Sequence, residues 1–399
     1  MLLTALVLLA AILGFLAWRR RGNESRGDSS GTLTRLAALV AILIALPLIT
    51  LGSAQSAKRV SAPAGFFGMI TQTDFTSVDA SKMAQGGVET LRLPVAWSSV
   101  QPDSTDGFDW GYTDSVVSQA AKAGISVLPF LYDSPSWVAK STTTLPVSGA
   151  QPLYWAHFVS EAVARYGPNG VFWDGHGPES EDPVPKLPIR KWQIWNEANF
   201  FYFADPISPP KYASLLKTSN KTIKAIDPGA TIVLSGLYGS PPAKQIKRRK
   251  AMASYDFLAK LYRAGARKYF DVAALHPYTP NTAQTKLLVE KFRKVMAAGG
   301  DRKKPLSITE VGWGSAPRGF LDVGSPAKQA RQLKSAYTYF LGNRKKLKLE
   351  SVFWFSWKDK KKSEPSCNFC YSTGLFDSRD GLRPKPAWPQ FVKFAGGRP

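Results

Sequence analysis

Two glutamates in this chain, Glu197 and Glu310, each end a short apolar run that has the pattern of a β-strand. Glu197 closes the run Trp192–Glu197 (WQIWNE), and Glu310 closes the run Leu306–Glu310 (LSITE). Where parallel strands form a barrel, the loops at their carboxyl ends build the site, so carboxylates at that position usually serve chemistry. A pair of them indicates an acid and a nucleophile, provided that the rest of the chain supplies the strands that bring them together.

The elements that must position these glutamates are visible as alternating strand-like and helix-like runs after Pro63. Eight runs have the near-continuous apolar character of a parallel strand that is buried on both faces. They are Phe66–Thr71, Val88–Pro94, Ile125–Tyr132, Ile189–Asn196, Thr231–Leu237, Phe270–Leu275, Leu306–Thr309 and Ser351–Ser356. Eight strand–helix units predict an α/β fold, a (β/α)8 TIM barrel rather than a doubly wound sheet. The irregular segment 167–187 precedes the fourth strand, so we expect it at the opposite end of the barrel, without a catalytic role.

The first 57 residues differ from the rest of the chain in composition. Residues Leu2–Trp18 and Leu36–Leu51 are almost wholly apolar, and five arginines lie between them. Each run approaches the length of about 17–20 residues that a bilayer requires, and the arginines mark the intervening loop as cytoplasmic. The pattern predicts an N-terminal membrane helical hairpin over residues 1–57 and an extracytoplasmic domain over residues 58–399. In the alternative, the second run is a signal peptide that is cut near Gly52–Ala54, and the domain is secreted.

The chain is strongly basic. Residues 58–399 hold 47 of the 52 Lys and Arg and 27 of the 29 Asp and Glu, which leaves a net charge of +20. The cations are scattered over the predicted helices and loops, with clusters only at Lys244–Lys250, Arg344–Lys348 and Lys358–Lys362. This distribution favours solvated surfaces over a nucleic-acid groove. The partners that we expect are the membrane and anionic cell-envelope polymers, and no nucleic acid.

Only two cysteines occur, and they are close together in the segment Ser366–Cys370 (SCNFC). A single such pair in an exported domain predicts a local disulfide between Cys367 and Cys370, with two free thiols as the alternative.

Numbering the eight strands places Glu197 at the end of the fourth and Glu310 at the end of the seventh. With the Asn196-Glu197 pair, this arrangement resembles the clan A glycoside hydrolases, including the cellulase-like family 5 and family 39, over roughly Phe66–Phe394. The resemblance implies that Glu197 is the acid/base, that Glu310 is the nucleophile, and that Asn196 hydrogen-bonds the sugar 2-hydroxyl. The acid needs a raised pKa, which apolar neighbours can provide.

The resemblance also implies roles for residues on other strands. Tyr278 would orient the nucleophile, and His276 would line the site. Arg92 ends an otherwise apolar strand, so it requires a carboxylate partner. The resemblance makes that partner the nucleophile, and an ordinary salt bridge at the barrel end is the alternative. Trp357 would form the platform beneath the sugar. Trp137 and Trp313 would add further subsites, with core packing as the alternative for each.

These residues predict a retaining glycoside hydrolase that acts on a β-linked carbohydrate without a metal or an organic cofactor. Two alternatives remain open at this point. One is a catalytically idle, membrane-tethered barrel that binds glycans, and the other is a transglycosylase that passes the glycosyl group to a second sugar. The sequence leaves the sugar and its linkage unspecified.

Overall fold

The computed structural model describes residues 62–399, except for 105–106, 318, 320, 364–367 and 379–380. The predicted membrane hairpin over residues 1–57 lies outside the described residues. Within the described part of the chain, no helix is long and apolar enough to cross a membrane.

Among the described residues, nine strands form one sheet in which every neighbouring pair is parallel. The strands are β1 Phe67–Ile70, β2 Thr90–Ala96, β3 Ser126–Tyr132, β4 Lys191–Ile194, β5 Thr231–Val233, β6 Leu237–Tyr238, β7 Ala273–His276, β8 Leu306–Val311 and β9 Leu349–Phe355. Their order in the sheet is β5-β4-β3-β2-β1-β9-β8-β7-β6. The first and last strands of the chain, β1 and β9, are therefore neighbours, as they are in a barrel.

The two ends of this order meet because β5 and β6 occupy one strand position. Val233 at the end of β5 forms a parallel bridge with Val272, the residue before β7, and β6 pairs with β7 itself. Leu234 N also donates to Val272 O (3.0 Å), which continues the ladder across the gap. Gly236 interrupts the strand because its backbone is left-handed (φ +65°), a conformation that glycine adopts without strain. The ring thus has eight strand positions, and the predicted barrel is confirmed.

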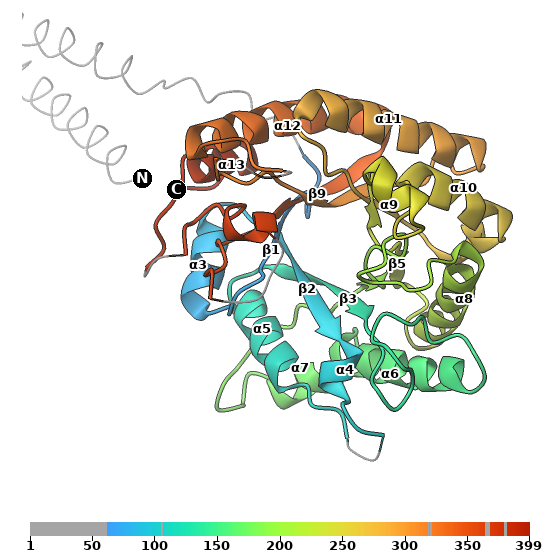
Figure 1. The fold of residues 1–399 in the computed structure, drawn as a ribbon. Coiled ribbons are helices and arrows are strands. Elements are labelled where there is room, and N and C mark those ends of the chain that lie inside the picture. The colour runs from blue at the N-terminus through green and yellow to red at the C-terminus, as the bar shows by residue number, and fades with distance from the viewer. Residues whose placement is uncertain (1–61, 105–106, 318, 320, 364–367, 379–380) are drawn as a thin grey trace, which may run out of the picture. The chain divides into compact units, whose positions relative to one another are not determined.

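Helices cover the outside of the ring, as Figure 1 shows. The helices of the described residues are α3 Ser77–Gln85, α4 Trp97–Val100, α5 Gly111–Lys122, α6 Gln151–Tyr166, α7 Val171–Gly175, α8 Pro209–Ile226, α9 Ala243–Lys247, α10 Ser254–Arg263, α11 Thr282–Ala298, α12 Pro326–Leu347 and α13 Ala387–Ala395, with the 3-10 turns η1 Ala266–Tyr269 and η2 Asn368–Tyr371. The long helices begin where the sequence supplies caps. Ser208 and Ser325 accept from the first turns of α8 and α12, and a proline follows each cap.

The predicted strands differ from the observed ones mainly at their ends. The predicted fifth strand, Thr231–Leu237, is split into β5 and β6 by the turn at Gly236. The segment 167–187 contains the short helix α7, whose Phe172 and Trp173 are buried. It lies between α6 and β4 in the chain, and therefore on the side of the barrel from which β4 starts.

Gly236 provides a test of how tightly the barrel interior is packed. A Cβ at this position would lie 2.1 Å from His276 Nε2, whereas a Cβ at Gly265, which has a similar left-handed backbone (φ +77°), would meet nothing within 4 Å. We expect Gly265→Ala to lower the free energy of unfolding by about 1–2 kcal/mol through backbone strain alone. Gly236→Ala should lose about 1–3 kcal/mol more, because the methyl group overpacks the core. Urea unfolding of both variants measures the difference, and equal losses would contradict the packing argument.

Candidate active site

Glu197 is held in place by an irregular turn after β4. The backbone is left-handed at Trp195 (φ +69°) and at Glu197 (φ +38°), a conformation that costs free energy in a residue with a side chain. Neighbouring strands compensate this cost. Trp195 N donates to Leu131 O (2.7 Å) and Glu197 N donates to Ser235 O (2.8 Å). The turn thereby directs the Glu197 carboxylate into the mouth of the barrel, where it is 6 % exposed.

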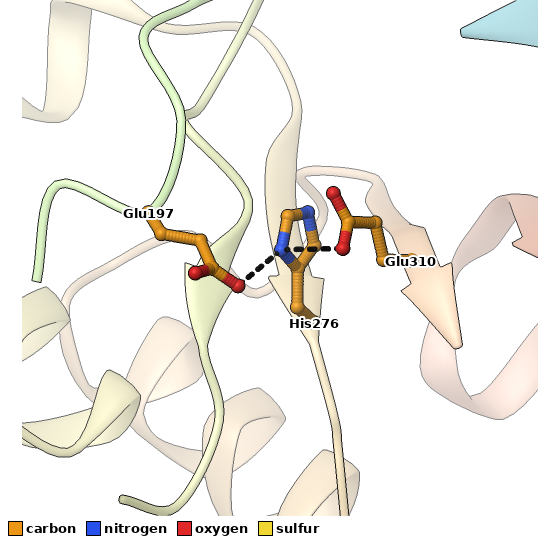
Figure 2. A group of neighbouring side chains, drawn as sticks. All are labelled: Glu197, His276 and Glu310. Atoms are coloured by element: carbon orange, nitrogen blue, oxygen red, sulfur yellow. Dashed lines mark hydrogen bonds and ion pairs between the residues drawn. The ribbon is translucent and has the colours of Figure 1, made fainter. Parts of the chain in front are cut away.

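Glu310 lies within the last residues of β8, where the pairing with β9 is irregular. The register shifts between Ile308 and Val311, so that Thr309 and Glu310 occupy a bulge. Bulges commonly re-aim side chains next to active sites. Figure 2 shows the result, in which Glu197 and Glu310 approach the His276 ring from two sides.

Arg92 connects the two halves of the site. Its side chain is fully buried, and each of its nitrogens has a partner: Nη1 donates to Glu310 Oε1 (2.6 Å), Nη2 to Asn196 Oδ1 (2.7 Å) and Nε to Gln193 Oε1 (2.6 Å). The carboxylate partner that the sequence requires is therefore Glu310. Tyr278 holds the other oxygen of the same carboxylate, because its hydroxyl donates to Glu310 Oε2 (2.7 Å).

His276 lies between the two carboxylates. Its Nδ1 is 2.8 Å from Glu197 Oε1 and 3.5 Å from Glu310 Oε2, and its Nε2 is 3.0 Å from Thr309 Oγ1. Burial and the nearby Arg92 hold the pKa of His276 well below its usual value, so the ring is neutral and carries one proton. Nδ1 faces the oxygens of both glutamates, and the Glu310 carboxylate, when ionised, can only accept a hydrogen bond. The proton therefore belongs on Nδ1, and Nε2 accepts from the Thr309 hydroxyl.

The neighbouring groups affect the pKa values of the two glutamates differently. Burial and then the charge of Glu310 hold the pKa of Glu197 well above its usual value. Burial also raises the pKa of Glu310, but the charge of Arg92 and the hydrogen bonds from Tyr278 and Arg92 act in the opposite direction. The arrangement favours a protonated Glu197 beside an ionised Glu310, the division of roles that an acid and a nucleophile require.

A cavity of about 800 Å³ opens above these groups. Arg92, Asn196, Glu197, Tyr278 and Glu310 contribute polar atoms to its wall. Its aromatic lining comes from the loops and strand ends around them: Phe130, Tyr132, Phe200, Tyr202, Phe203, Tyr238, Phe355 and Phe369. A wall of this kind, mostly apolar with a few convergent polar groups, is typical of a small-molecule or substrate site.

A second hollow of about 710 Å³ adjoins the first. The two share Thr71, Gln72, Pro94 and Lys360 as lining residues. The depression at this end of the barrel therefore extends beyond the two carboxylates toward β1.

Glu197, His276 and Glu310 offer metal-ligand atoms within 4.8 Å of one another. However, Arg92 and Tyr278 already donate to the two oxygens of Glu310. A divalent cation at this point would face the guanidinium of Arg92. The donor set therefore fits an acid beside a nucleophile better than a metal site.

Three tryptophans that were expected to contact the sugar lie outside the cavity wall and have partners in the protein framework. Trp357 is fully buried, two residues beyond β9, and its indole N–H donates to Asp79 on α3 (2.8 Å). Trp313 is fully buried and donates to Thr279 O (2.8 Å), and the half-buried Trp137 donates to Gln101 O (3.2 Å). The cavity wall includes none of these three tryptophans.

Several site residues were missed in the sequence. Gln193 and Thr309 are fully buried polar side chains beside Arg92 and His276, and a polar residue inside an apolar strand is the signal that marks both. Phe355, the last residue of β9, lines the cavity, whereas Trp357 does not. Cys370 also lines the cavity, but its predicted disulfide partner Cys367 lies outside the described residues. That pairing stays a prediction.

A scan of the sequence against protein-family models finds no match, and a search of curated proteins finds none either. Solved structures do match. A family 39 glycoside hydrolase from the gut symbiont Bacteroides cellulosilyticus WH2 is similar at a TM-score of 0.59 and 20% identity, over 84% of this chain and 64% of that one. A monomeric β-xylosidase from Caulobacter crescentus CB15 has a TM-score of 0.59 at 18% identity, over 84% of this chain and 69% of that one.

A GH5_18 protein from Streptomyces cattleya in complex with Manβ1-4GlcNAc has a TM-score of 0.58 at 15% identity, over 83% of this chain and 80% of that one. The fold is therefore a TIM barrel similar to those of these glycoside hydrolase structures. At these identities the likeness establishes the fold, and the chemistry must be argued from the site.

Thr309 allows a test of the hydrogen bond that sets the His276 tautomer. Thr309→Val keeps the shape of the side chain and removes the hydroxyl, which leaves a buried imidazole nitrogen without its partner. We expect the free energy of unfolding to fall by about 1–3 kcal/mol. Thr309→Ser keeps the hydroxyl and should lose only about 0.8 kcal/mol for the missing methyl group. Urea unfolding measures both variants, and a valine variant as stable as the parent would contradict the proposed bond.

Proposed function

We propose that this protein is a retaining glycoside hydrolase, with Glu310 as the nucleophile and Glu197 as the acid/base. The observation that carries the proposal is the approach of the two carboxylates, whose oxygens lie within 4.8 Å of each other across His276. Retaining enzymes hold their carboxyl groups about 5–5.5 Å apart, whereas inverting enzymes need about 6.5–9.5 Å to admit a water molecule between them.

In the first step, a Glu310 oxygen bonds to the anomeric carbon as the bond from that carbon to the leaving oxygen breaks. Glu197 gives its proton to the leaving oxygen, and a glycosyl ester of Glu310 forms. In the second step, Glu197 takes a proton from a water molecule, whose oxygen attacks the anomeric carbon and releases Glu310. The released sugar has the anomeric configuration of the substrate, because the carbon is inverted twice.

The environment of each group supports its role. Arg92 and Tyr278 bind the two oxygens of Glu310 and stabilise its negative charge. Burial raises the pKa of Tyr278, so this side chain stays protonated and continues to donate. His276 donates to one oxygen of Glu197 and leaves the other oxygen available for the proton that is transferred. A barrel that only binds glycans would not need this difference between two buried carboxylates, and a transglycosylase would use the same ester with a sugar in place of water.

The substrate class that we propose is a β-linked oligo- or polysaccharide. The two adjoining hollows, about 800 and 710 Å³, give space beyond a single sugar ring. The aromatic side chains of the wall suit the C–H faces of sugars, which pack on rings while the hydroxyls remain free to hydrogen-bond. The cellular location that accompanies this proposal is outside the membrane, on the basis of the arginines between the two apolar N-terminal runs.

The stereochemistry of the product tests the mechanism. An NMR time course with an aryl β-glycoside panel should show the β-hemiacetal first, with the α-anomer appearing only through mutarotation. Glu310→Gln should lower kcat on the order of 10³-fold or more, because the amide cannot form the ester. Initial appearance of the α-anomer, or undiminished turnover by Glu310→Gln, would overturn the assignment.

The pH dependence tests which glutamate is the acid. The first step needs Glu310 ionised and Glu197 protonated, so kcat/KM should fall at low pH as Glu310 takes up a proton and at high pH as Glu197 loses one. Since the pKa of Glu197 is held well above its usual value, the alkaline limb should lie above the ordinary range of a glutamate. Glu197→Gln should remove this limb and lower kcat/KM about 10²–10⁴-fold. An alkaline limb that persists unchanged in Glu197→Gln would assign it to another group.

A further inference from the structure

The segment that includes α9 carries an unusual concentration of positive charge. Five of the seven residues from Lys244 to Lys250 are Lys or Arg, and all five are exposed. None of the residues of α9 is buried, so the helix contributes nothing to the core. We call Lys244, Lys247, Arg248, Arg249 and Lys250 the α9 cations. A short helix without a core-facing side needs another reason for this composition.

The α9 cations follow the end of β6, on the side of the barrel where the catalytic carboxylates lie, and Figure 1 shows α9 leading from there to α10. Backbone contacts join the segment to the loop after Glu197. Phe201 N donates to Lys250 O (3.0 Å), and Phe200 pairs with Ala251 in an antiparallel bridge. Phe200 and Tyr202 from this loop line the catalytic cavity. The segment that carries the α9 cations is therefore joined by backbone contacts to a loop of the cavity wall.

Little of this charge is neutralised within the described part of the chain. Lys250 forms an ion pair with Asp205 (3.5 Å) and lies over the Phe201 ring (4.8 Å). Lys244, Lys247, Arg248 and Arg249 form no ion pair with any acidic side chain that the structure describes. A group of exposed cations beside a cleft raises the local concentration of anionic ligands and increases the rate at which they bind.

We propose that the α9 cations bind the anionic groups of an acidic polysaccharide whose chain runs through the catalytic cavity. The inference rests on the proposed glycosidase function and names its substrate class, a β-linked glycan that carries carboxylate or sulfate groups. The charged groups of sugar units outside the cavity meet Lys244, Lys247, Arg248 and Arg249, while the ring to be cleaved lies over Glu197 and Glu310. Tyr202 lines the cavity, follows the residue that Lys250 contacts and is 64 % exposed, so it offers a ring face for an intervening sugar.

Two other polyanions fit this place less well. A helix that binds a lipid surface needs an apolar face, whereas the only large apolar side chain of α9 is Ile246, which is 43 % exposed. A nucleic acid would be held by its phosphates, but its backbone offers no O-glycosidic bond between sugars for the carboxylate pair to cleave. The connection to the cavity therefore favours a glycan.

The test measures binding in the full-length chain with Glu310→Gln, so that the result does not depend on turnover. Carboxymethyl cellulose and cellulose sulfate are the anionic probes, and hydroxyethyl cellulose is the neutral probe on the same backbone. The variant combines Lys244→Gln, Lys247→Gln, Arg248→Gln and Arg249→Gln. The matched control removes four exposed cations near the starts of β8 and β9, at the opposite end of the barrel: Arg302→Gln, Lys303→Gln, Lys345→Gln and Lys346→Gln. Thermal unfolding checks that both variants remain folded.

The parent should bind an anionic probe more tightly than the neutral one, and this preference should disappear as NaCl rises from about 50 mM to about 0.5 M. The α9 variant should bind the anionic probe about tenfold or more weakly, whereas the control variant should keep most of its affinity. The preferred probe identifies carboxylate or sulfate as the recognised group. Equal losses in the two variants would overturn the proposal, since general charge would then explain the binding. A DNA duplex and phosphatidylglycerol vesicles serve as further probes. If the α9 substitutions weaken binding to either of these more than binding to the polysaccharides, the proposal would also be overturned.

Discussion

Arg92 is a guanidinium buried inside the barrel, and the free-energy cost of its burial is offset only where acceptors bind its N–H donors. The acceptors come from Glu310 on β8, from Gln193 on β4 and from Asn196 just after β4. One buried charge thereby links strands on three sides of the barrel mouth and holds the nucleophile in one orientation. Burial and then the same charge hold the pKa of His276 well below its usual value, and this charge opposes the effect of burial on Glu310.

The site depends on a difference between two residues of the same type. Glu197 is positioned by a strained turn after β4 and faces the neutral His276. Glu310 lies in a strand bulge and faces the cationic Arg92. Burial alone would raise the pKa of both groups, so the neighbours decide which of the two keeps its proton. This is how one barrel mouth can present an acid and a nucleophile a few ångströms apart.

Whether an aromatic side chain carries a hydrogen-bond donor separates the tryptophans from Phe355. A buried indole N–H usually has an acceptor, and Trp357, Trp313 and the half-buried Trp137 each donate to one in the framework of the protein. Their rings are thereby committed to packing around the barrel. The phenyl ring of Phe355 has no such requirement and is available to the cavity wall.

The sequence by itself determined the number and order of the strands, because near-continuous apolar runs are what a buried parallel strand requires. It also predicted which residues gather at the barrel mouth, since Glu197, Glu310 and Tyr278 end or follow strands whose carboxyl ends meet there, and Arg92 lies within the strand that ends beside them. Only the tertiary structure decided which polar atoms pair. The hydrogen bond between Thr309 and His276 depends on the direction of a side chain in the β8 bulge. The position of Trp357 outside the cavity wall depends on the direction of a side chain beyond the end of β9. Both directions are set by packing between segments that are far apart in the chain, so local sequence pattern does not predict them.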